Sequence, residues 1–323
     1  MIRGFLNEGG RLRAVEEVST LPESMVWIDL ISPTNEEEKE LEKSLGIDLP
    51  TKEEMEEIEI SSRLYHENGA AFMTAILPAR ADGDDPDMQP VTFVLTETRL
   101  VTIRYHEPRA FTTFPMRAEK VPMGCETGEG VLIALLEAIV DRLADILERD
   151  GRDIDAISRD IFQRKGARPT KSKDFQKTLE TIGQKGDLTS KIRDSLVTLE
   201  RLIGFLGHCT IQRKSGKETR ERVKTLARDL RSLADHASFL SQKITFLLDA
   251  TLGMINIEQN AIIKIFSVAA VVFLPPTLIA SIYGMNFKFM PELDKAYGYP
   301  TALALMVFSA ILPYVYFKYR RWL

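Results

Sequence analysis

The sequence predicts an α+β membrane protein with an N-terminal cytosolic α/β domain, a long stalk helix and a C-terminal hairpin of two transmembrane helices. Strand-like and helix-like segments mix over residues 1–114, whereas residues 130–260 show the periodicity of helices. Residues 261–283 and 299–317 are apolar enough to cross a bilayer, because about 20 apolar residues match a hydrocarbon core of ~30 Å. The segments upstream of them are too charged to enter a membrane.

These segments divide the chain of 323 residues into six parts. We expect a cytosolic α/β domain with a helical second half, and a stalk helix that continues into the first transmembrane helix. An extracytoplasmic loop, the second transmembrane helix and a basic cytoplasmic tail follow. The expected bounds, in chain order, are 1–217, 218–260, 261–283, 284–298, 299–317 and 318–323.

The first part of the cytosolic domain shows strand and capping signals. Four short runs of β-branched and apolar residues predict strands, at residues 26–30, 70–77, 91–96 and 99–104. Residues 32–35 cap a helix whose first turn is acidic, and Thr51 with Glu54 forms a capping box for another. The acidic turn at residues 81–87 lacks the glutamate and spacing of an EF-hand, so we expect a solvated loop there.

Three helices are predicted after the strands. Apolar residues between 131 and 147 recur with a period of 3.6, and a break follows at residues 165–169. A second helix follows, and a third starts near Glu218 and meets no proline before Pro275. At 1.5 Å per residue, a continuous helix of about 60 residues would be roughly 85–90 Å long. Such a rod is too long for one domain, and amphipathic rods usually bundle with copies of themselves.

Charge sets the expected orientation. Lys318, Arg320 and Arg321 lie next to the second span, and cations in that position favour the cytoplasmic side. Two spans then return the N-terminal domain to the same side, while the loop has no cationic excess. The first residues lack the apolar core of a secretory signal. We therefore expect a multi-pass protein of the inner (plasma) membrane with both termini in the cytoplasm.

Composition and motifs exclude several function classes. The net charge of −5 argues against a nucleic-acid partner, which requires a dense basic face. The sequence contains no Walker A loop, no zincin motif and no nucleophile–base arrangement. Cys125 and Cys209 are far apart, lack metal-ligand spacing and are expected to be buried thiols. We therefore expect a protein that is not an enzyme and has no cofactor.

One face of the first span gathers small and hydroxyl-bearing residues. A helical projection places eight residues within about 120° of one another, namely Asn260, Ile263, Ser267, Ala270, Leu274, Thr277, Ser281 and Gly284. Asp249 lies eleven residues, or three turns, before Asn260 and continues this face. Small residues are common where membrane helices pack, so the face fits either helix packing or the lining of a pore.

The span ends in the motif Tyr283-Gly284-Met285-Asn286-Phe287. Behind it follow Met290-Pro291-Glu292-Leu293 in the loop and Gly298-Tyr299-Pro300 at the start of the second span. This arrangement resembles the CorA family of divalent-cation channels. The match covers both spans, the loop and the basic tail, and it continues more weakly upstream through Leu247-Leu248-Asp249.

The resemblance implies a homopentamer with a funnel-shaped cytosolic domain and a pore lined by the first span of each copy. The family pattern maps Gly284, Met285 and Asn286 onto an outer selectivity filter, with Asn286 as the metal-facing residue and Glu292 in the loop behind it. The other implied pore residues are Asp249 at the inner mouth, Asn260, Ser267, Thr277 and Ser281 along the lining, and Ile263, Phe266 and Leu274 at a hydrophobic constriction. Thr225 stands where the family's regulatory metal site has an acid, so no residue is assigned to that site.

These residue types suit a hydrated divalent ion. Mg²⁺ keeps several of its waters, and amide and carbonyl oxygens accept hydrogen bonds from those waters without binding too tightly for release. We therefore expect influx of Mg²⁺, with Co²⁺ and Ni²⁺ as secondary ions, driven by the membrane potential; Mg²⁺ would also be the regulatory ion. Two alternatives remain open: a zinc transporter of the related branch, with or without proton coupling, and a membrane-anchored scaffold or sensor without transport.

Overall fold

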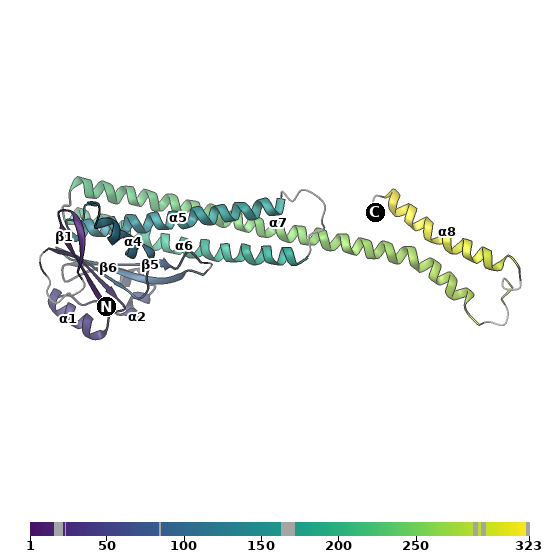
Figure 1. Cartoon of the computed structure of the whole chain (residues 1–323), viewed down its shortest axis with the longest axis horizontal. Coiled ribbons are helices and arrows are strands. Elements are labelled where there is room, and N and C mark those ends of the chain that lie inside the picture. The colour runs from purple at the N-terminus through teal and green to yellow at the C-terminus, as the bar shows by residue number, and fades with distance from the viewer. Residues whose placement is uncertain are drawn as a thin grey trace. The chain divides into compact units, whose positions relative to one another are not determined.

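A computed structural model of the chain describes residues 1–15, 22, 24–83, 85–162, 172–286, 290–291 and 295–320. The chain divides into two compact units, Met1–Leu248 and Asp249–Leu323. Helix α7 (Lys217–Tyr283) contributes its first half to one unit and its second half to the other (Figure 1).

A seven-stranded sheet with the order β2-β1-β3-β7-β6-β5-β4 forms the centre of the first unit. The strands are β1 (Ile2–Glu8), β2 (Arg11–Val15), β3 (Met25–Ile31), β4 (Leu64–Glu67), β5 (Ala70–Ala79), β6 (Asp87–Leu95) and β7 (Leu100–Arg104). β3 and β7 pair in parallel with Trp27 opposite Leu100. The other pairs of described strands are antiparallel.

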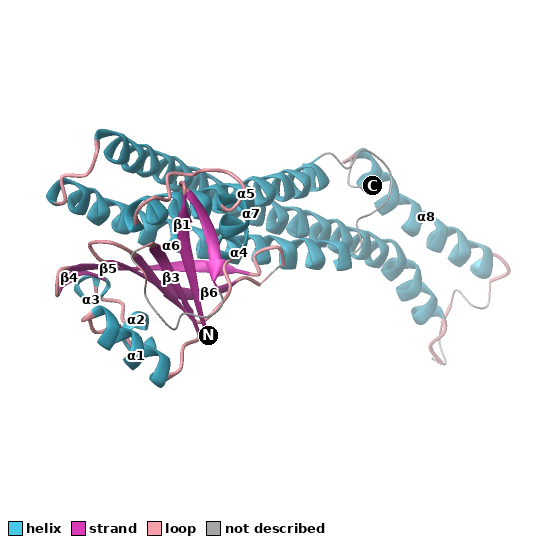
Figure 2. Ribbon diagram, turned by 60° about the vertical axis from the view of Figure 1, so that its left-hand side comes forward, coloured by secondary structure: helices cyan, strands magenta, loops and turns pink. Residues whose placement is uncertain are grey.

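Both faces of the sheet are covered by helices, as Figure 2 shows. α1 (Asn35–Leu45), α2 (Lys52–Glu56) and α3 (Ile60–Arg63) lie on one side. The other side carries α4 (Arg109–Ala118), α5 (Gly128–Phe162), α6 (Ser172–Gln212) and the first part of α7. Strand alternation separates two apolar cores: Phe72 of β5 faces the core under α1 and α2, whereas its neighbours Ala71 and Met73 face the core under α5 and α6.

The four strands expected from the sequence are present, with β6 starting earlier, at Asp87. The two expected helix starts are also confirmed, because Thr34 and Thr51 each form a complete capping box. β1, β2 and β4 were not predicted. β2 and β4 are edge strands of five and four residues with mostly exposed or half-exposed side chains, so they carry little apolar pattern.

A buried ion pair joins the parallel strands β3 and β7. The Asp29 carboxylate accepts hydrogen bonds from Arg104 Nη2 at 2.9 Å and from Thr102 Oγ1 at 2.8 Å. Trp27 Nε1 donates to the same Thr102 hydroxyl at 2.9 Å, and Arg104 Nη1 donates to the His106 carbonyl oxygen at 2.8 Å. Both charged side chains are 2% exposed. Removing one partner of such a pair lowers the free energy of unfolding by about 3–5 kcal/mol, because the remaining charge stays buried.

The acidic turn between β5 and β6 is tied to the helices by ion pairs. Asp82 accepts from Arg109 at 2.8 Å, from Arg142 at 2.6 Å and from Arg149 at 2.8 Å. These hydrogen bonds lower the pKa of Asp82 to about 2. Asp82, Gly83 and Asp85 are exposed, as expected, whereas Ala81 and Pro86 are buried. The Asp82 carboxylate links α4 and α5 rather than being freely solvated.

The helical half of the unit follows the predicted order. α5 begins at Gly128, where an added Cβ would overlap backbone atoms of Arg99 and Leu100, so only glycine permits this approach. The predicted break at residues 165–169 lies outside the described residues. α7 begins at Lys217, close to the expected Glu218, and runs without interruption to Tyr283.

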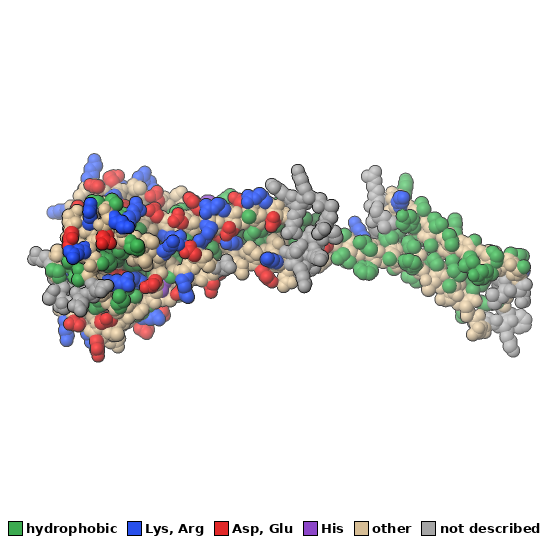
Figure 3. Space-filling model, viewed as in Figure 1, with side chains coloured by type: hydrophobic (Ala, Val, Ile, Leu, Met, Phe, Trp, Pro, Cys, Tyr) green, Lys and Arg blue, Asp and Glu red, His purple; other side chains and the backbone are tan. Residues whose placement is uncertain are grey.

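The second unit holds the end of α7 and helix α8 (Gly298–Tyr319). α7 and α8 contain 18-residue windows of mean hydropathy 2.2 and 1.7, so their length and composition qualify both as membrane spans. Figure 3 shows hydrophobic side chains over this unit and mixed acidic and basic side chains over the first. The predicted apolar stretches fall within these two helices.

Asp150 is a buried carboxyl group between α5 and α6. It is 1% exposed, and its Oδ2 accepts from Thr189 Oγ1 at 2.7 Å. Oδ1 has no hydrogen-bond partner among the described residues, and the Lys185 Nζ atom lies 3.6 Å away and donates to Asp153 at 2.6 Å instead. Burial raises the pKa of Asp150.

We predict that Asp150→Asn stabilises the first unit at neutral pH. The raised pKa means that the folded state binds the proton more tightly than the unfolded state, so this carboxyl favours folding most at acid pH and loses that effect as the pH rises through its folded pKa. The amide oxygen can still accept from Thr189. The melting temperature of the variant, relative to wild type, should therefore rise between about pH 4 and pH 7, by about 2–4 °C for each kcal/mol.

The matched control is Asp153→Asn, because that carboxylate is 46% exposed and paired with the same lysine. It should show no such gain with pH. A difference between Asp150→Asn and wild type that stays constant across this range would contradict the prediction.

Candidate functional site

The outer motif stands at the C-terminal end of α7. The Gly284 N–H donates to the Ala280 carbonyl oxygen at 2.9 Å, and the Met285 N–H donates to that of Ile282 at 3.3 Å, which closes the last helical turn. A Cβ on Gly284 would lie 3.1 Å from the Ala280 oxygen, so a side chain there would crowd the turn. Asn286 follows with an exposed side chain. The end of a helix carries partial negative charge, which favours cations at this motif.

The predicted pore residues all lie on α7 and are exposed in the single chain. The polar ones are Asp249, Asn260, Ser267, Thr277 and Ser281. The three apolar ones at the expected constriction, Ile263, Phe266 and Leu274, are 60%, 72% and 65% exposed. The predicted pore residues therefore all belong to one helix. The large apolar side chains among them require lipid or another helix to cover them.

Thr277 shows how this face presents oxygen atoms. Its Oγ1 donates to the Phe273 carbonyl oxygen at 2.7 Å. The hydroxyl proton is used within the helix, so the oxygen offers its free lone pairs as acceptors. Water molecules bound to a cation point their hydrogens outward and would find acceptors here.

Two consecutive prolines, Pro275 and Pro276, lie inside α7 immediately before Thr277. Proline has no N–H, so the carbonyl groups of Val271 and Val272 lack their usual donors four residues on. The helix nevertheless continues through this point to Tyr283.

The ends of α7 and α8 enclose a cavity of about 370 Å³ next to the motif. It is lined by Tyr283 and Gly284 on one side and by Lys295, Tyr299 and Ala302 on the other. The place of Tyr299 beside the glycine follows from the way the two helix ends meet. Met290 and Pro291 are described in the loop, whereas Glu292 lies outside the described residues.

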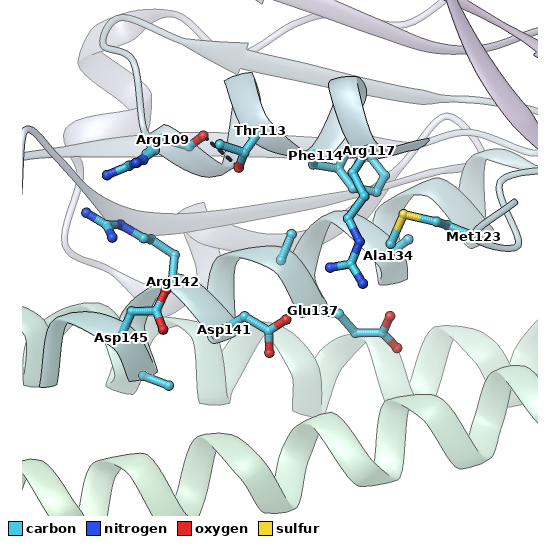
Figure 4. A pocket seen from close by; sticks show the side chains of 12 residues that line it. Arg109, Thr113, Phe114, Arg117, Met123, Ala134, Glu137, Asp141, Arg142 and Asp145 are labelled. Carbon is cyan, nitrogen blue, oxygen red and sulfur yellow. Dashed lines mark hydrogen bonds between the residues drawn. The ribbon is translucent and has the colours of Figure 1, made fainter. Parts of the chain in front are cut away.

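The first unit also has a cavity, of about 630 Å³, between α4 and α5 (Figure 4). Glu137, Asp141 and Asp145 line it from α5, and Arg117 faces them from α4. Glu137 accepts from Arg222 at 2.8 Å, and burial raises the pKa of Asp141. Across the described residues, no three His, Cys, Asp or Glu side chains gather closely enough to hold a metal.

The chain thus has an α/β unit, one long helix and an apolar two-helix hairpin with a polar motif between its helices, the features of a membrane transport protein. It matches the family of CorA-like Mg²⁺ transporter proteins over residues 22–320. It is 37% identical to the magnesium transport protein CorA of Haemophilus influenzae over 326 residues and 38% identical to that of Pasteurella multocida over 325, covering all of each chain.

Solved structures show the same fold. The complete structure of the CorA magnesium transporter from Methanocaldococcus jannaschii superposes with a TM-score of 0.80 at 22% identity, over all of this chain and 99% of that one. The protein therefore belongs to the CorA family of Mg²⁺ transporters, which confirms the resemblance seen in the outer motif.

Proposed function

We propose that this chain forms a homopentameric channel that admits Mg²⁺, and secondarily Co²⁺ and Ni²⁺, across the inner (plasma) membrane. The observation that carries the proposal is Gly284-Met285-Asn286 at the end of an apolar helix with one polar face, in a full-length relative of magnesium transport proteins. The exposed side chains on that face support assembly, because one two-helix hairpin cannot enclose a path for water. Five is the copy number that the family resemblance implies.

In this proposal the Asn286 amide and the carbonyl groups at the end of α7 form the selectivity filter. They accept hydrogen bonds from the waters of a hydrated ion, which Mg²⁺ releases reluctantly. Gly284 keeps the turn compact, and Met285 flanks the ring. Glu292 in the loop behind the filter adds negative charge that gathers cations before entry.

Below the filter, the polar residues of the same face form a sequence of weak binding sites. Ser281, Thr277, Ser267 and Asn260 present hydroxyl or amide oxygens, and Asp249 marks the cytoplasmic mouth. The apolar residues Leu274, Phe266 and Ile263 interrupt them as a constriction that excludes water when closed.

No chemical energy source is needed for influx. One charge crossing 100 mV is worth about 2.3 kcal/mol, so a divalent cation gains about 4.6 kcal/mol on moving inward. That gain corresponds to a concentration ratio of roughly 10³ at equilibrium. The cytoplasmic side of the membrane is at negative potential, which gives this direction, and the basic tail favours a cytoplasmic location for both termini.

The direct test is ion flux into liposomes that contain the purified protein. Mg²⁺ entry that follows an imposed potential and needs no pH gradient supports the channel. Flux of Zn²⁺ in preference to Mg²⁺, or flux only with a pH gradient, would indicate a zinc transporter, and the absence of flux would indicate a scaffold.

For the filter, Asn286→Ala should lower Mg²⁺ uptake by about tenfold or more, because each copy loses a hydrogen bond worth about 1 kcal/mol to the hydrated ion. Pentamer assembly should be intact by size-exclusion chromatography with light scattering. Ser309→Ala on α8 is the control, since it also removes one polar group from a span. Wild-type uptake by a well-expressed Asn286→Ala variant would refute this role.

For the constriction, Leu274→Ser should raise the basal leak severalfold in the flux assay, because a hydroxyl wets a neck that is otherwise apolar. Ile279→Ser is the matched control, because it makes a similar change on the opposite face of the same span. An unchanged or smaller leak in Leu274→Ser would show that the neck lies elsewhere on α7.

Cytosolic Mg²⁺ should also close the channel. Five acidic copies repel one another, and cations between them would favour a compact closed state to the extent that they bind it more tightly. Protease protection of the first unit should therefore rise, and currents fall, over the same millimolar range. Thr225, in place of an acid, should make this dependence weaker than in relatives with a full acidic pair. Protection and currents that both stay flat to about 20 mM would remove this part of the proposal.

A further inference from the structure

The turn from α6 to α7 carries a groove of about 630 Å³ that the proposed channel does not use. Gly204, Gly207 and Ile211 form its α6 wall together with His208 and Thr210, and the α7 wall consists of Lys217, Arg220, Glu221 and Lys224. Its volume is that of small-molecule sites, which span about 300–1,000 Å³.

The glycines leave the groove open. A Cβ on Gly204 would meet nothing within 4 Å, and a Cβ on Gly207 would be at ordinary contact, 3.9 Å from Val223. Packing therefore does not require glycine at 204, although glycine weakens a helix interior. The glycine at 204 leaves the α6 backbone exposed beside Ile211, a side chain that is 64% exposed.

The groove is basic in a chain that is acidic overall. Among the charged residues that line it, Lys217, Arg220 and Lys224 are basic and Glu221 is acidic, whereas the whole chain has a net charge of −5. Lys224 is paired with Glu221 at 3.0 Å. Within the described residues, the side chains of Lys217, Arg220 and His208 make no hydrogen bond or ion pair.

The position of these cations is unfavourable for the helix alone. Lys217 and Arg220 lie in the first turn of α7 on either side of the acidic Glu218. The helix dipole is positive at this end, so the two cations are unfavourably placed. Residues 217, 220 and 224 have the i, i+3, i+7 spacing of one helix face and extend over about 10 Å. A bound anion with several charges in a row would relieve this repulsion along its whole length.

We propose that this groove binds a nucleoside polyphosphate. The phosphates would lie along Lys217, Arg220 and Lys224, where Arg offers paired donors and Lys a compact charge. The base would rest on the imidazole ring of His208 and the apolar surface of Ile211. The groove is too short for an extended polymer, so a single nucleotide is the ligand that fits both its charge and its size.

The test uses the full-length protein in detergent and magnesium-free buffer, with binding followed by calorimetry. Adenosine triphosphate should bind saturably and more tightly than inorganic tripolyphosphate, and adenosine alone should not bind. Added salt should weaken both anions, because exposed charges are screened. This measurement does not depend on transport, so it stands apart from the channel proposal.

Two variants locate the site. Lys217→Glu with Arg220→Glu should weaken binding of adenosine triphosphate by about tenfold or more, because two attractive contacts become repulsive. Lys39→Glu with Lys43→Glu makes the same charge change on exposed positions of α1 and should alter affinity less than about twofold. Gly204→Leu should fill the groove and reduce adenosine triphosphate to the affinity of tripolyphosphate while leaving tripolyphosphate unchanged.

Circular dichroism melts establish that each variant is folded. If the variant with the double charge reversal does not fold, Gly204→Leu still tests the site. If wild type shows no saturable binding up to about 5 mM, the proposal is overturned. Equal weakening by the α1 control would overturn it too, since binding would then reflect net charge. Equal affinity for adenosine triphosphate and tripolyphosphate would overturn the part of the proposal that concerns the base.

Discussion

Membrane hydrocarbon offers no partner to a backbone polar group, and the second unit follows from this constraint. Residues 261–283 and α8 meet it as helices, in which the backbone groups bond within the segment except where Pro275, Pro276 and Pro313 supply no N–H. Polar side chains on α7 meet it partly in the same way, as when the Thr277 hydroxyl donates to the Phe273 carbonyl oxygen. At Thr277 the hydroxyl oxygen then has only lone pairs left to offer, which suits a water molecule that donates a hydrogen bond. In the proposed channel, a helix formed under this constraint would also carry the surface that a hydrated cation follows.

In the first unit, the environment of an aspartate carboxyl group differs with its depth below the surface. At the surface, Asp82 collects three arginines and its pKa falls to about 2. Inside the sheet, the opposite charges of Asp29 and Arg104 are paired through hydrogen bonds from the guanidinium group to the carboxylate. Between α5 and α6, Asp150 has an oxygen without a hydrogen bond, and burial raises its pKa. The sheet thus holds a fully paired buried charge, whereas the α5–α6 contact holds a carboxyl group whose pKa is raised by burial.

The sequence predicted those parts of the fold that depend on local pattern. Apolar length located both spans, spacing located the start of α7 near Glu218, and Thr51 with Glu54 located a helix cap. β2 and β4 escaped notice because edge strands bury little, and the pairing of β3 with β7 joins segments about 70 residues apart. The three arginines around Asp82 come from two helices that no short motif connects.

For the candidate site, the helical projection placed the predicted residues on one helix, and the motif located its outer end. A pore along that face would form between neighbouring copies, whose arrangement is not encoded in the period of one helix. The cavity beside Gly284 depends on how two helix ends meet, which periodicity cannot express.

The two prolines give α7 a place where its rigidity changes. Most helices resist bending because hydrogen bonds join each turn to the next. At Pro275 and Pro276 two adjacent hydrogen bonds are missing. Bending there costs less than elsewhere along the helix, and the hinge lies between Leu274 below and Thr277 above. The segment that ends in the motif could then tilt as a lever while the cytoplasmic half stays in place. In the proposed channel, the neck and the outer ring would then change in width independently of each other.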